Sequence, residues 1–271
     1  VKDDTGVTVR LAAPAQRIVS LAPNITEMLY AAGAGGHLVG AVEYSNYPAA
    51  AQKLPRIGGY ARLDLEAIAA LKPDLAAGWA SGNSPAHIEK LRALGIPVYL
   101  AEPERIDDVA GNLERYGELA GVQNTAQAAA TDFRHRLTEL RQRYGDRPKV
   151  RTFYQIWQQP LMTIGGSQVI SDVIHLCGGE NIFGNLKALA PAVTIEAVLS
   201  ADPEVIIASG MGEARPEWLA DWRQWPALTA VKRDNLYFIP PDLIQRHTPR
   251  LAEGAAQLCA DLESARARRG Q

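Results

Sequence analysis

The chain has 271 residues, 47% of them hydrophobic, and a formal net charge of -2 at pH 7. That length suffices for one large domain or for two units of ordinary size. The balanced charge excludes the basic footprint of a nucleic-acid-binding protein, since the main basic run is the short one at residues 266–269, and no apolar run is long enough to cross a membrane.

In the first half of the chain, short apolar runs alternate with segments of helical period. We interpret the apolar runs as buried strands. Alternating strands and helices predict a mainly parallel sheet that is covered on both faces. The predicted strands are residues 17–22, 39–42, 75–77 and 96–100, and the predicted helices are residues 26–32, 65–71 and 88–94.

Three loops of this half carry an aromatic side chain. Tyr47 and Trp79 follow predicted strands, and Tyr60 follows a Gly-Gly pair. Ligands of open parallel sheets lie beyond the carboxyl ends of the strands. For any one of these aromatics packing is the better explanation, but three on successive loops predict a stacking surface for a ligand.

The middle of the chain, residues 124–144, has the period of one long helix. A helix of about 20 residues spans about 30 Å. On its own, this pattern predicts a long surface helix. Because the sequences on its two sides resemble each other, we predict that it joins two lobes. Its apolar positions are Ala126, Ala129, Phe133, Leu137, Leu140 and Tyr144.

The second half of the chain repeats features of the first half. Residues 65–68 match 195–198, and residues 72–75 match 202–205, both at an offset of 130 positions. A constant offset in two neighbouring places indicates an internal repeat. We predict an N-terminal lobe at residues 1–121, a connecting helix at 122–145 and a C-terminal lobe at 146–271.

The second half also has its own sequence of elements. A fourth aromatic, Trp157, lies in a loop after a predicted strand, and residues 240–247 are predicted to form a polar loop. Trp218 and Trp222 are four residues apart, which predicts core positions on an amphipathic stretch. Strands are predicted at residues 150–156, 205–208 and 236–239, and helices at 169–176, around Glu196, and from about residue 249.

The chain has two cysteines, Cys177 and Cys259. In an exported protein, such a widely separated pair indicates one disulfide, and the alternative is two buried free thiols. Two cysteines cannot complete a zinc site by themselves.

Other chemistry has little support in the sequence. The five histidines lack metal-ligand spacing, although His247 in the polar loop is a candidate ligand contact. No phosphate-binding Gly-Lys-Ser/Thr loop and no Gly-x-Ser-x-Gly elbow occur. Nothing pairs a nucleophile with a base. We therefore expect neither an enzyme nor a resident metal or cofactor.

Several motifs together resemble the periplasmic vitamin B12-binding proteins, over about residues 16–262. That family consists of class III periplasmic binding proteins, in which two similar α/β lobes with mainly parallel sheets are joined by one long rigid helix. The motifs are Ser20-Leu21-Ala22-Pro23 with Thr26-Glu27, Ser45-Asn46-Tyr47-Pro48, Leu65-Glu66 with Leu71-Lys72-Pro73-Asp74-Leu75, Trp79 with Gly82-Asn83, and Cys177-Gly178-Gly179-Glu180-Asn181-Ile182-Phe183.

The resemblance implies a function and a set of residues. It implies a monomer in the periplasm, exported with a signal peptide, that captures cobalamin between its lobes and delivers it to an ABC permease dimer in the inner membrane. Glu66 and Glu196 match the carboxylates that meet arginines on the permease, and the two cysteines match a disulfide pair. The implied ligand-binding residues are Tyr47, Tyr60, Trp79, Trp157, Asp242 and Arg246.

The chain also departs from the family pattern. Ala190-Pro191 stands where the family has a tryptophan before proline, and Leu243 stands where it has a bulky aromatic. Tyr60 lies where haem-carrying relatives place an iron-ligating tyrosine, and a phenolate can hold ferric haem. Haem is therefore the alternative ligand, with Tyr60 as the iron ligand. A siderophore binder and an enzyme are less favoured alternatives.

Overall fold

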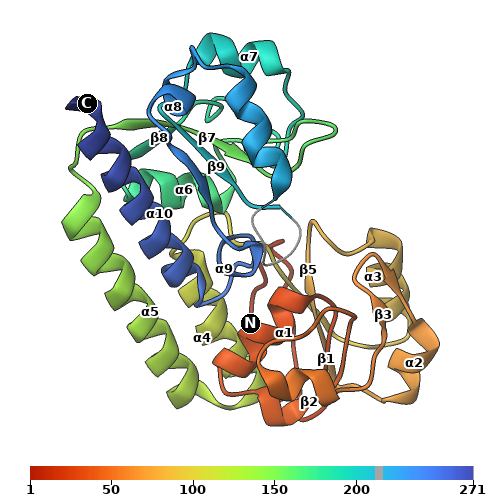
Figure 1. The fold of residues 1–271 in the computed structure, drawn as a ribbon. Coiled ribbons are helices and arrows are strands. Elements are labelled where there is room, and N and C mark those ends of the chain that lie inside the picture. The colour runs from red at the N-terminus through yellow and green to blue at the C-terminus, as the bar shows by residue number, and fades with distance from the viewer. Residues whose placement is uncertain (211–215, 271) are drawn as a thin grey trace. The chain divides into compact units, whose positions relative to one another are not determined.

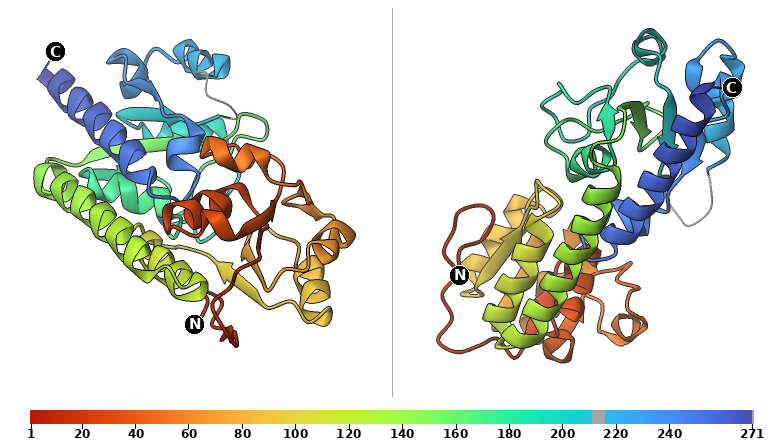
Figure 2. Two further views of the ribbon diagram at one scale, coloured as in Figure 1. Left: turned by 90° about the horizontal axis from the view of Figure 1, so that it is seen from below. Right: turned by 90° about the vertical axis from the view of Figure 1, so that its left-hand side faces the viewer.

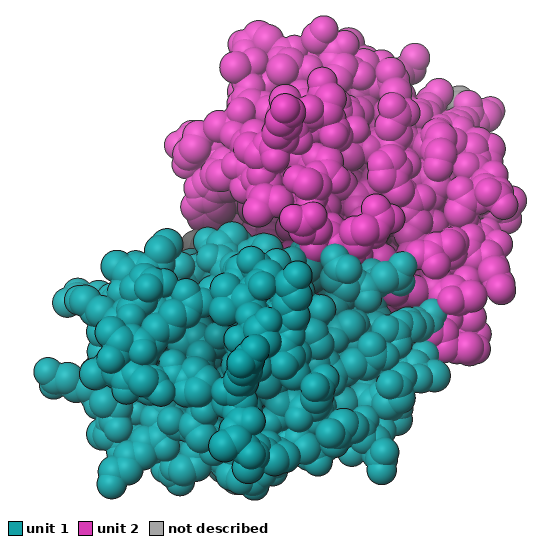
Figure 3. Space-filling model, turned by 180° about the vertical axis from the view of Figure 1, so that it is seen from behind, with its two compact units in different colours: residues 1–103, 107–134 teal, residues 104–106, 135–271 magenta. Residues whose placement is uncertain are grey.

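The computed structural model describes residues 1–210 and 216–270. The chain forms two compact units, shown in separate colours in Figure 3. Unit 1 comprises Val1–Pro103 and Asp107–Arg134, and unit 2 comprises Glu104–Ile106 and His135–Gln271. The division between the units thus falls within the long central helix.

Unit 1 is built on a sheet of four parallel strands in the described part of the chain, in the order β2-β1-β5-β6. The residues of β1 and β6 are all buried, so both faces of the sheet are covered. This is the parallel sheet that the strand–helix alternation predicted. The strands are β1 (Ile18–Ser20), β2 (Leu38–Ala41), β5 (Leu75–Trp79) and β6 (Val98–Ala101).

The helices of unit 1 supply the apolar cover of this sheet (Figures 1 and 2). Ile68 and Leu91, from two of these helices, pack with Val19 and Ala76 of the sheet in one buried cluster. The first helix contacts β1 and β5. The helices are α1 (Pro23–Ala31), η1 (Gly35–His37), η2 (Ala49–Lys53), α2 (Leu65–Ala70), α3 (Pro85–Ala93) and α4 (Asp108–Ala120).

One of these helices, α4, was not predicted from the sequence. Its buried side chains nevertheless follow helical spacing, and a left-handed Gly121 ends it. Helical periodicity is therefore present in the sequence of this segment. The buried apolar positions are Val109, Leu113, Tyr116 and Leu119.

The segment after η2 also differs from the prediction. Instead of a plain glycine-rich loop, β3 (Gly58–Gly59) and β4 (Arg62–Leu63) form a short antiparallel hairpin. Gly58 has a φ of +87°, and a Cβ there would lie 2.5 Å from the Arg62 carbonyl oxygen. Glycine is therefore required at this position, and Tyr60 is carried on the turn of the hairpin.

The long helix α5 (Gln123–Tyr144) confirms the helix predicted at residues 124–144. It begins one residue earlier than expected, at Gln123. In unit 1, Arg134 Nη2 donates to Glu114 Oε2 of α4 at 3.0 Å. In unit 2, the helix runs beside α10 (Leu251–Ala267) (Figures 1 and 2).

Unit 2 has a second sheet of four parallel strands within the described residues, in the order β10-β9-β7-β8. Unit 1 has the same connectivity, because in each unit the first strand lies between the second and the third. The strand at residues 179–181 was not among the predicted elements. The strands are β7 (Val150–Gln155), β8 (Gly179–Asn181), β9 (Val205–Ala208) and β10 (Leu236–Phe238).

Three helices of unit 2, α6, α7 and α10, match predicted helices. Trp222 is buried, as expected, and packs edge-to-face on Phe153 of β7 with the ring centroids 5.6 Å apart. The helices are α6 (Val169–Leu176), α7 (Ile195–Ala201), η3 (Glu217–Gln224), α8 (Thr229–Lys232), α9 (Pro241–Ile244), α10 and η4 (Arg268–Gly270).

The internal repeat extends to the turns that lead into β5 and β9. The carboxylate of Asp74 accepts from the Arg17 backbone N–H at 3.0 Å, and that of Glu204 accepts from the Arg151 N–H at 3.2 Å. These carboxylates are 130 positions apart, so each copy is tied to the first strand of its sheet in the same way. Each turn also contains one residue with positive φ, Lys72 at 47° and Asp202 at 42°.

The disulfide is present and lies in unit 2. Cys177 follows α6, Cys259 lies on α10, and both residues are fully buried. The bond therefore joins α6 to the C-terminal helix, and it confirms the disulfide prediction over the two free thiols.

A buried carboxyl on α10 leads to a prediction about pH. Asp261 Oδ2 is buried without a hydrogen-bond partner among the described residues, and burial raises the pKa of Asp261 to about 7. The ordinary value is 3.8. Between about pH 4 and 7 the folded state therefore binds more protons than the unfolded state, and the free energy of unfolding falls as the pH rises.

Asp261→Asn is expected to remove this pH-dependent loss. At pH 8 the variant should be more stable than the wild type by about 2 kcal/mol, after allowing for partial exposure of the carboxyl. Urea denaturation at pH 5 and pH 8 measures the effect, and Asp132→Asn, an exposed carboxylate on α5, is the control. An unchanged pH dependence in Asp261→Asn would contradict the prediction.

Candidate ligand-binding site

Two of the predicted aromatics meet in unit 1. Tyr60 lies at the turn of the β3–β4 hairpin, and Trp79 is the last residue of β5. Their ring centroids are 6.4 Å apart, with an angle of 41° between the ring planes. Tyr60 is 43% exposed. A pair of aromatic rings that can stack on a ligand thus lies at the carboxyl end of β5, with Trp79 from the strand and Tyr60 from the hairpin.

The loop after β5 holds the Trp79 ring in place. Trp79 Nε1 donates to Glu102 Oε1 at 3.3 Å, and the backbone N–H of Ser81 donates to Glu102 Oε2 at 2.6 Å. A Cβ on Gly82 would lie 1.9 Å from Trp79 Cε3. The ring therefore rests on the loop backbone, which only glycine permits at this position.

Tyr47 lies on a separate loop after β2. Its side chain is 43% exposed, and its peptide bond to Pro48 is cis. The loop is anchored from below, where the Ser45 and Thr26 hydroxyls are 2.9 Å apart and Arg56 Nη1 donates to the Val42 carbonyl at 3.1 Å. These two interactions hold the loop, on which Tyr47 itself is exposed.

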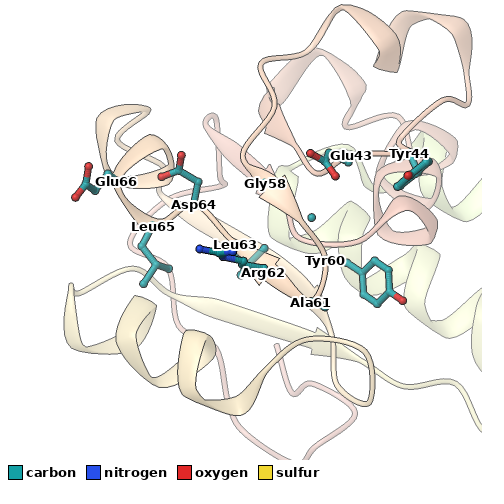
Figure 4. A pocket seen from close by; sticks show the side chains of 11 residues that line it. Glu43, Tyr44, Gly58, Tyr60, Ala61, Arg62, Leu63, Asp64, Leu65 and Glu66 are labelled. Carbon is teal, nitrogen blue, oxygen red and sulfur yellow. The ribbon is translucent and has the colours of Figure 1, made fainter.

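A pocket of about 770 Å³ opens beside this surface in unit 1 (Figure 4). Figure 4 shows Tyr60 and Glu66 at opposite ends of the group of residues that line it. Glu43, Tyr44 and Asp64 also line this pocket, whereas Trp79 does not. The pocket therefore includes only one of the three predicted aromatics of this unit.

In unit 2, Trp157 lies just beyond the end of β7. The chain folds back so that the Met162 N–H donates to the Trp157 carbonyl at 3.1 Å, and Trp157 Nε1 donates to the Gln159 carbonyl at 3.0 Å. A tight turn thus presents the indole ring. As in unit 1, the aromatic follows a strand of the parallel sheet.

The predicted polar loop is partly helical, which corrects the loop prediction. Pro241 sits in the first turn of the short helix α9, where its missing N–H costs nothing. Arg246 Nη2 lies 3.2 Å from Asp242 Oδ1, and Arg250 Nη2 lies 3.9 Å from Asp242 Oδ2. The structure therefore adds Arg250, four positions after Arg246, to the predicted pair.

His247 is buried next to this cluster in sequence. Its Nε2 lies 3.4 Å from Gln168 Nε2, and burial lowers the pKa of His247 to about 4. Gln168 Oε1 accepts from the Ile170 N–H at the start of α6, which leaves the Gln168 NH₂ to donate to the histidine. The imidazole is thus neutral at physiological pH.

Glu66 and Glu196 occupy equivalent exposed positions on their own units. Each is the second residue of a short helix, α2 or α7, and each helix has a side-chain cap at its start. Asp64 Oδ1 accepts from the Ala67 N–H at 2.9 Å, and Thr194 Oγ1 accepts from the Ala197 N–H at 3.2 Å. The pKa of the Glu196 carboxyl is lowered, mainly by a hydrogen bond from the backbone and to a smaller extent by a hydrogen bond from the Thr194 side chain.

The described residues contain neither a metal-binding cluster nor a membrane-spanning helix. No group of three or more His, Cys, Asp or Glu side chains is arranged to hold a metal ion. No helix in the same residues is both long and apolar enough to cross a membrane.

Two repeats of one parallel α/β topology, with aromatic side chains beyond their strands, are the features of a two-lobed substrate-binding protein. Residues 18–243 match the family of periplasmic binding proteins. The chain belongs to this family. The fold-class prediction is confirmed, including its two units with parallel sheets.

Individual relatives are similar over nearly the whole chain. The chain is 40% identical over 253 residues to the vitamin B12-binding protein of Vibrio cholerae serotype O1, covering 93% of this chain and 91% of that protein. The crystal structure of the periplasmic vitamin B12 binding protein BtuF of Vibrio cholerae matches with a TM-score of 0.85 and 39% identity, over 93% and 98% of the two chains.

A haem binder shares the fold at lower identity. The periplasmic heme-binding protein RhuT from Roseiflexus sp. RS-1 matches with a TM-score of 0.79 and 22% identity, over 93% of this chain and 99% of that chain. All three relatives are binding proteins rather than enzymes, in agreement with the expectation that this chain is not an enzyme.

Proposed function

We propose that this chain is an extracytoplasmic substrate-binding protein that captures cobalamin, or another corrinoid, for import. The observation that carries this proposal is the 40% identity to a vitamin B12-binding protein over 93% of the chain. The match to the BtuF structure at 39% identity supports it. The haem binder is only 22% identical, which is evidence for the fold alone.

The ligand-binding residues are aromatic side chains on both units and a polar cluster on unit 2. Stacking on a corrin ring contributes about 1 kcal/mol for each aromatic beyond its buried area. A corrin ring carries amide groups at its edge, and the charged cluster of unit 2 supplies donors and an acceptor for them. We assign Tyr47, Tyr60, Trp79, Trp157, Asp242 and Arg246 to this role and add Arg250.

The partner is the permease dimer of an ABC importer in the inner membrane. Glu66 and Glu196 are exposed and stand at equivalent positions of the repeat, which suits a two-fold symmetric partner with one basic site for each carboxylate. The protein then acts in the periplasm, as a monomer, where the disulfide is stable.

Haem remains the second candidate ligand, and one observation favours it. Tyr60 is 43% exposed on a hairpin turn, beside Trp79. An exposed phenol of this kind can become the phenolate ligand of ferric haem. The same side chain can stack on a corrin ring. Haem would need the Tyr60 hydroxyl as the iron ligand, whereas a corrin ring would need only the aromatic ring.

Titrations of the purified protein with cyanocobalamin and with hemin test the proposal. We expect submicromolar binding of cyanocobalamin that survives Tyr60→Phe, because stacking needs the ring and not the hydroxyl. Tyr30→Phe, at a half-buried tyrosine of α1 that does not line the pocket beside Tyr60, is the control. Hemin binding with a tyrosinate-type spectrum that Tyr60→Phe abolishes would instead assign the protein to haem uptake.

A further inference from the structure

We propose that Asn83 is a positioning residue that holds Tyr60 and Trp79 as one prearranged binding surface and thereby sets the affinity for the ligand. This inference rests on the proposed function, since it concerns the same aromatic pair. Asn83 is 3% exposed and lies just beyond the loop that carries the Trp79 ring.

The side-chain amide of Asn83 joins separate segments of unit 1. Its Oδ1 accepts from the Trp79 backbone N–H at 2.8 Å. Its Nδ2 donates to the Leu21 carbonyl and to the Tyr60 carbonyl, both at 2.8 Å. Leu21 directly follows β1, Tyr60 lies on the hairpin turn, and Trp79 ends β5. Both amide hydrogens and the amide oxygen are thus used on three segments.

The neighbouring strand leaves room for this amide. A Cβ on Gly78 would lie 2.8 Å from Asn83 Oδ1. That contact is shorter than a side chain tolerates, so glycine in β5 permits the close approach. Glycine is thus needed at two positions, at Gly78 to make room for the Asn83 amide and at Gly82 to make room for the Trp79 ring.

The hairpin that carries Tyr60 depends on such a tie. Its two strands have two residues each, and an isolated hairpin is only marginally stable in water. At its base, the Glu43 N–H donates to the Gly58 carbonyl at 2.9 Å, and the Asp64 N–H donates to the Ile57 carbonyl at 2.9 Å. At the turn, Asn83 fastens the Tyr60 backbone to β1 and to the Trp79 loop.

A fixed pair of rings binds more tightly than a mobile pair. When a ligand binds to a mobile hairpin, the conformational entropy that the hairpin loses weakens binding. When the hairpin is already ordered, this loss does not occur on binding. Asn83 itself is buried below the aromatic surface, so it acts through Tyr60 and Trp79. Its loss should therefore lower affinity without removing any group that stacks on the ligand.

The test compares two buried asparagines of unit 1. Asn112 is 1% exposed, accepts from the Tyr99 hydroxyl at 2.7 Å and donates to Asp4 at 2.9 Å. Both Asn83→Ala and Asn112→Ala should lower the melting temperature. We expect Asn83→Ala to weaken cyanocobalamin binding at least tenfold, and Asn112→Ala to change it less than twofold. If both variants lost the same amount of cyanocobalamin affinity, Asn83 would contribute only to the stability of the fold, and the proposal would be wrong.

Asn83→Asp gives a readout that lost stability alone would not produce. A carboxylate still accepts from the Trp79 N–H but faces the Leu21 and Tyr60 carbonyls without a proton to donate. Once protonated, the acid can donate to one of them. Affinity of this variant should therefore rise from pH 8 to pH 5, relative to the wild type at the same pH. A constant ratio to the wild type would overturn the proposal.

A measurement without ligand separates this proposal from the proposed function. Hydrogen exchange of residues 58–63 should be at least tenfold faster in Asn83→Ala than in the wild type and in Asn112→Ala. If exchange is unchanged, Asn83 does not hold the hairpin and the inference fails. If exchange rises but the wild type binds no corrinoid, the proposed ligand is wrong while the positioning role of Asn83 stands.

Discussion

Replacing Glu66 and Glu196 together with alanine is expected to abolish corrinoid uptake while the purified protein keeps its affinity for the ligand. Both carboxylates are exposed at the starts of helices α2 and α7. The caps of these helices are Asp64 and Thr194, which the substitutions leave in place. The fold should therefore persist, and the loss should fall on docking to the permease.

The expected size of the effect follows from the loss of paired charges across an interface. Removing one member of a close charge pair leaves its partner uncompensated, so loss of both carboxylates should weaken docking by at least about 100-fold. Uptake by cells that lack the native protein measures the effect, together with a cyanocobalamin titration of the purified variant.

A matched control removes the same charge from other helices. Glu118 on α4 and Glu139 on α5 are also exposed, and the double alanine variant at these positions should transport normally. Normal uptake by the Glu66 and Glu196 double variant would exclude the docking role. Lost ligand affinity in that variant would place the two residues in the binding site or in the stability of the fold.

Loss of the disulfide is expected to have the largest effect on stability. The bond between Cys177 and Cys259 closes a loop with a sequence separation of 82. Chain entropy predicts that opening a loop of this length lowers the free energy of unfolding by roughly 4 kcal/mol. The double variant Cys177→Ala with Cys259→Ala should show this loss without burying new polar groups.

Urea denaturation of the double variant, beside the wild type with and without dithiothreitol, measures the contribution of the bond. Reduced wild type and the double variant should agree in their free energy of unfolding. Affinity for the ligand in the folded variant should change little, because the bond joins α6 to α10 rather than the loops of the candidate site. A loss below about 1 kcal/mol would show that native contacts hold these helices together without the bond.

Local patterns in the sequence were enough to predict much of the fold. Apolar spacing predicted α5 to within one residue, because helical period is a property of consecutive residues. Alternating strands and helices predicted two parallel sheets. The repeat at an offset of 130 predicted that Glu66 and Glu196 would be equivalent, and the structure places both as the second residue of a short helix.

Elements held by distant partners were the ones that the sequence did not reveal. The three-residue strand β8 forms by pairing with β7, about 30 positions away, and the two-residue strands of the 58–63 hairpin are too short to show a period. The helix α9 has only four residues, so a proline-rich polar segment looked like a loop. Short elements carry too few residues for a local signal.

For the candidate site, too, the sequence indicated some features and the tertiary structure decided the others. Residue type and local position were sufficient to propose Trp79, which follows a strand of the parallel sheet, and Tyr60, which lies in a glycine-rich loop. Their contact at 6.4 Å, and the hydrogen bonds by which Asn83 fastens both to Leu21, were decided only by the tertiary structure. Those bonds join residues up to 62 positions apart, and no local pattern encodes which distant backbone groups a buried amide will meet.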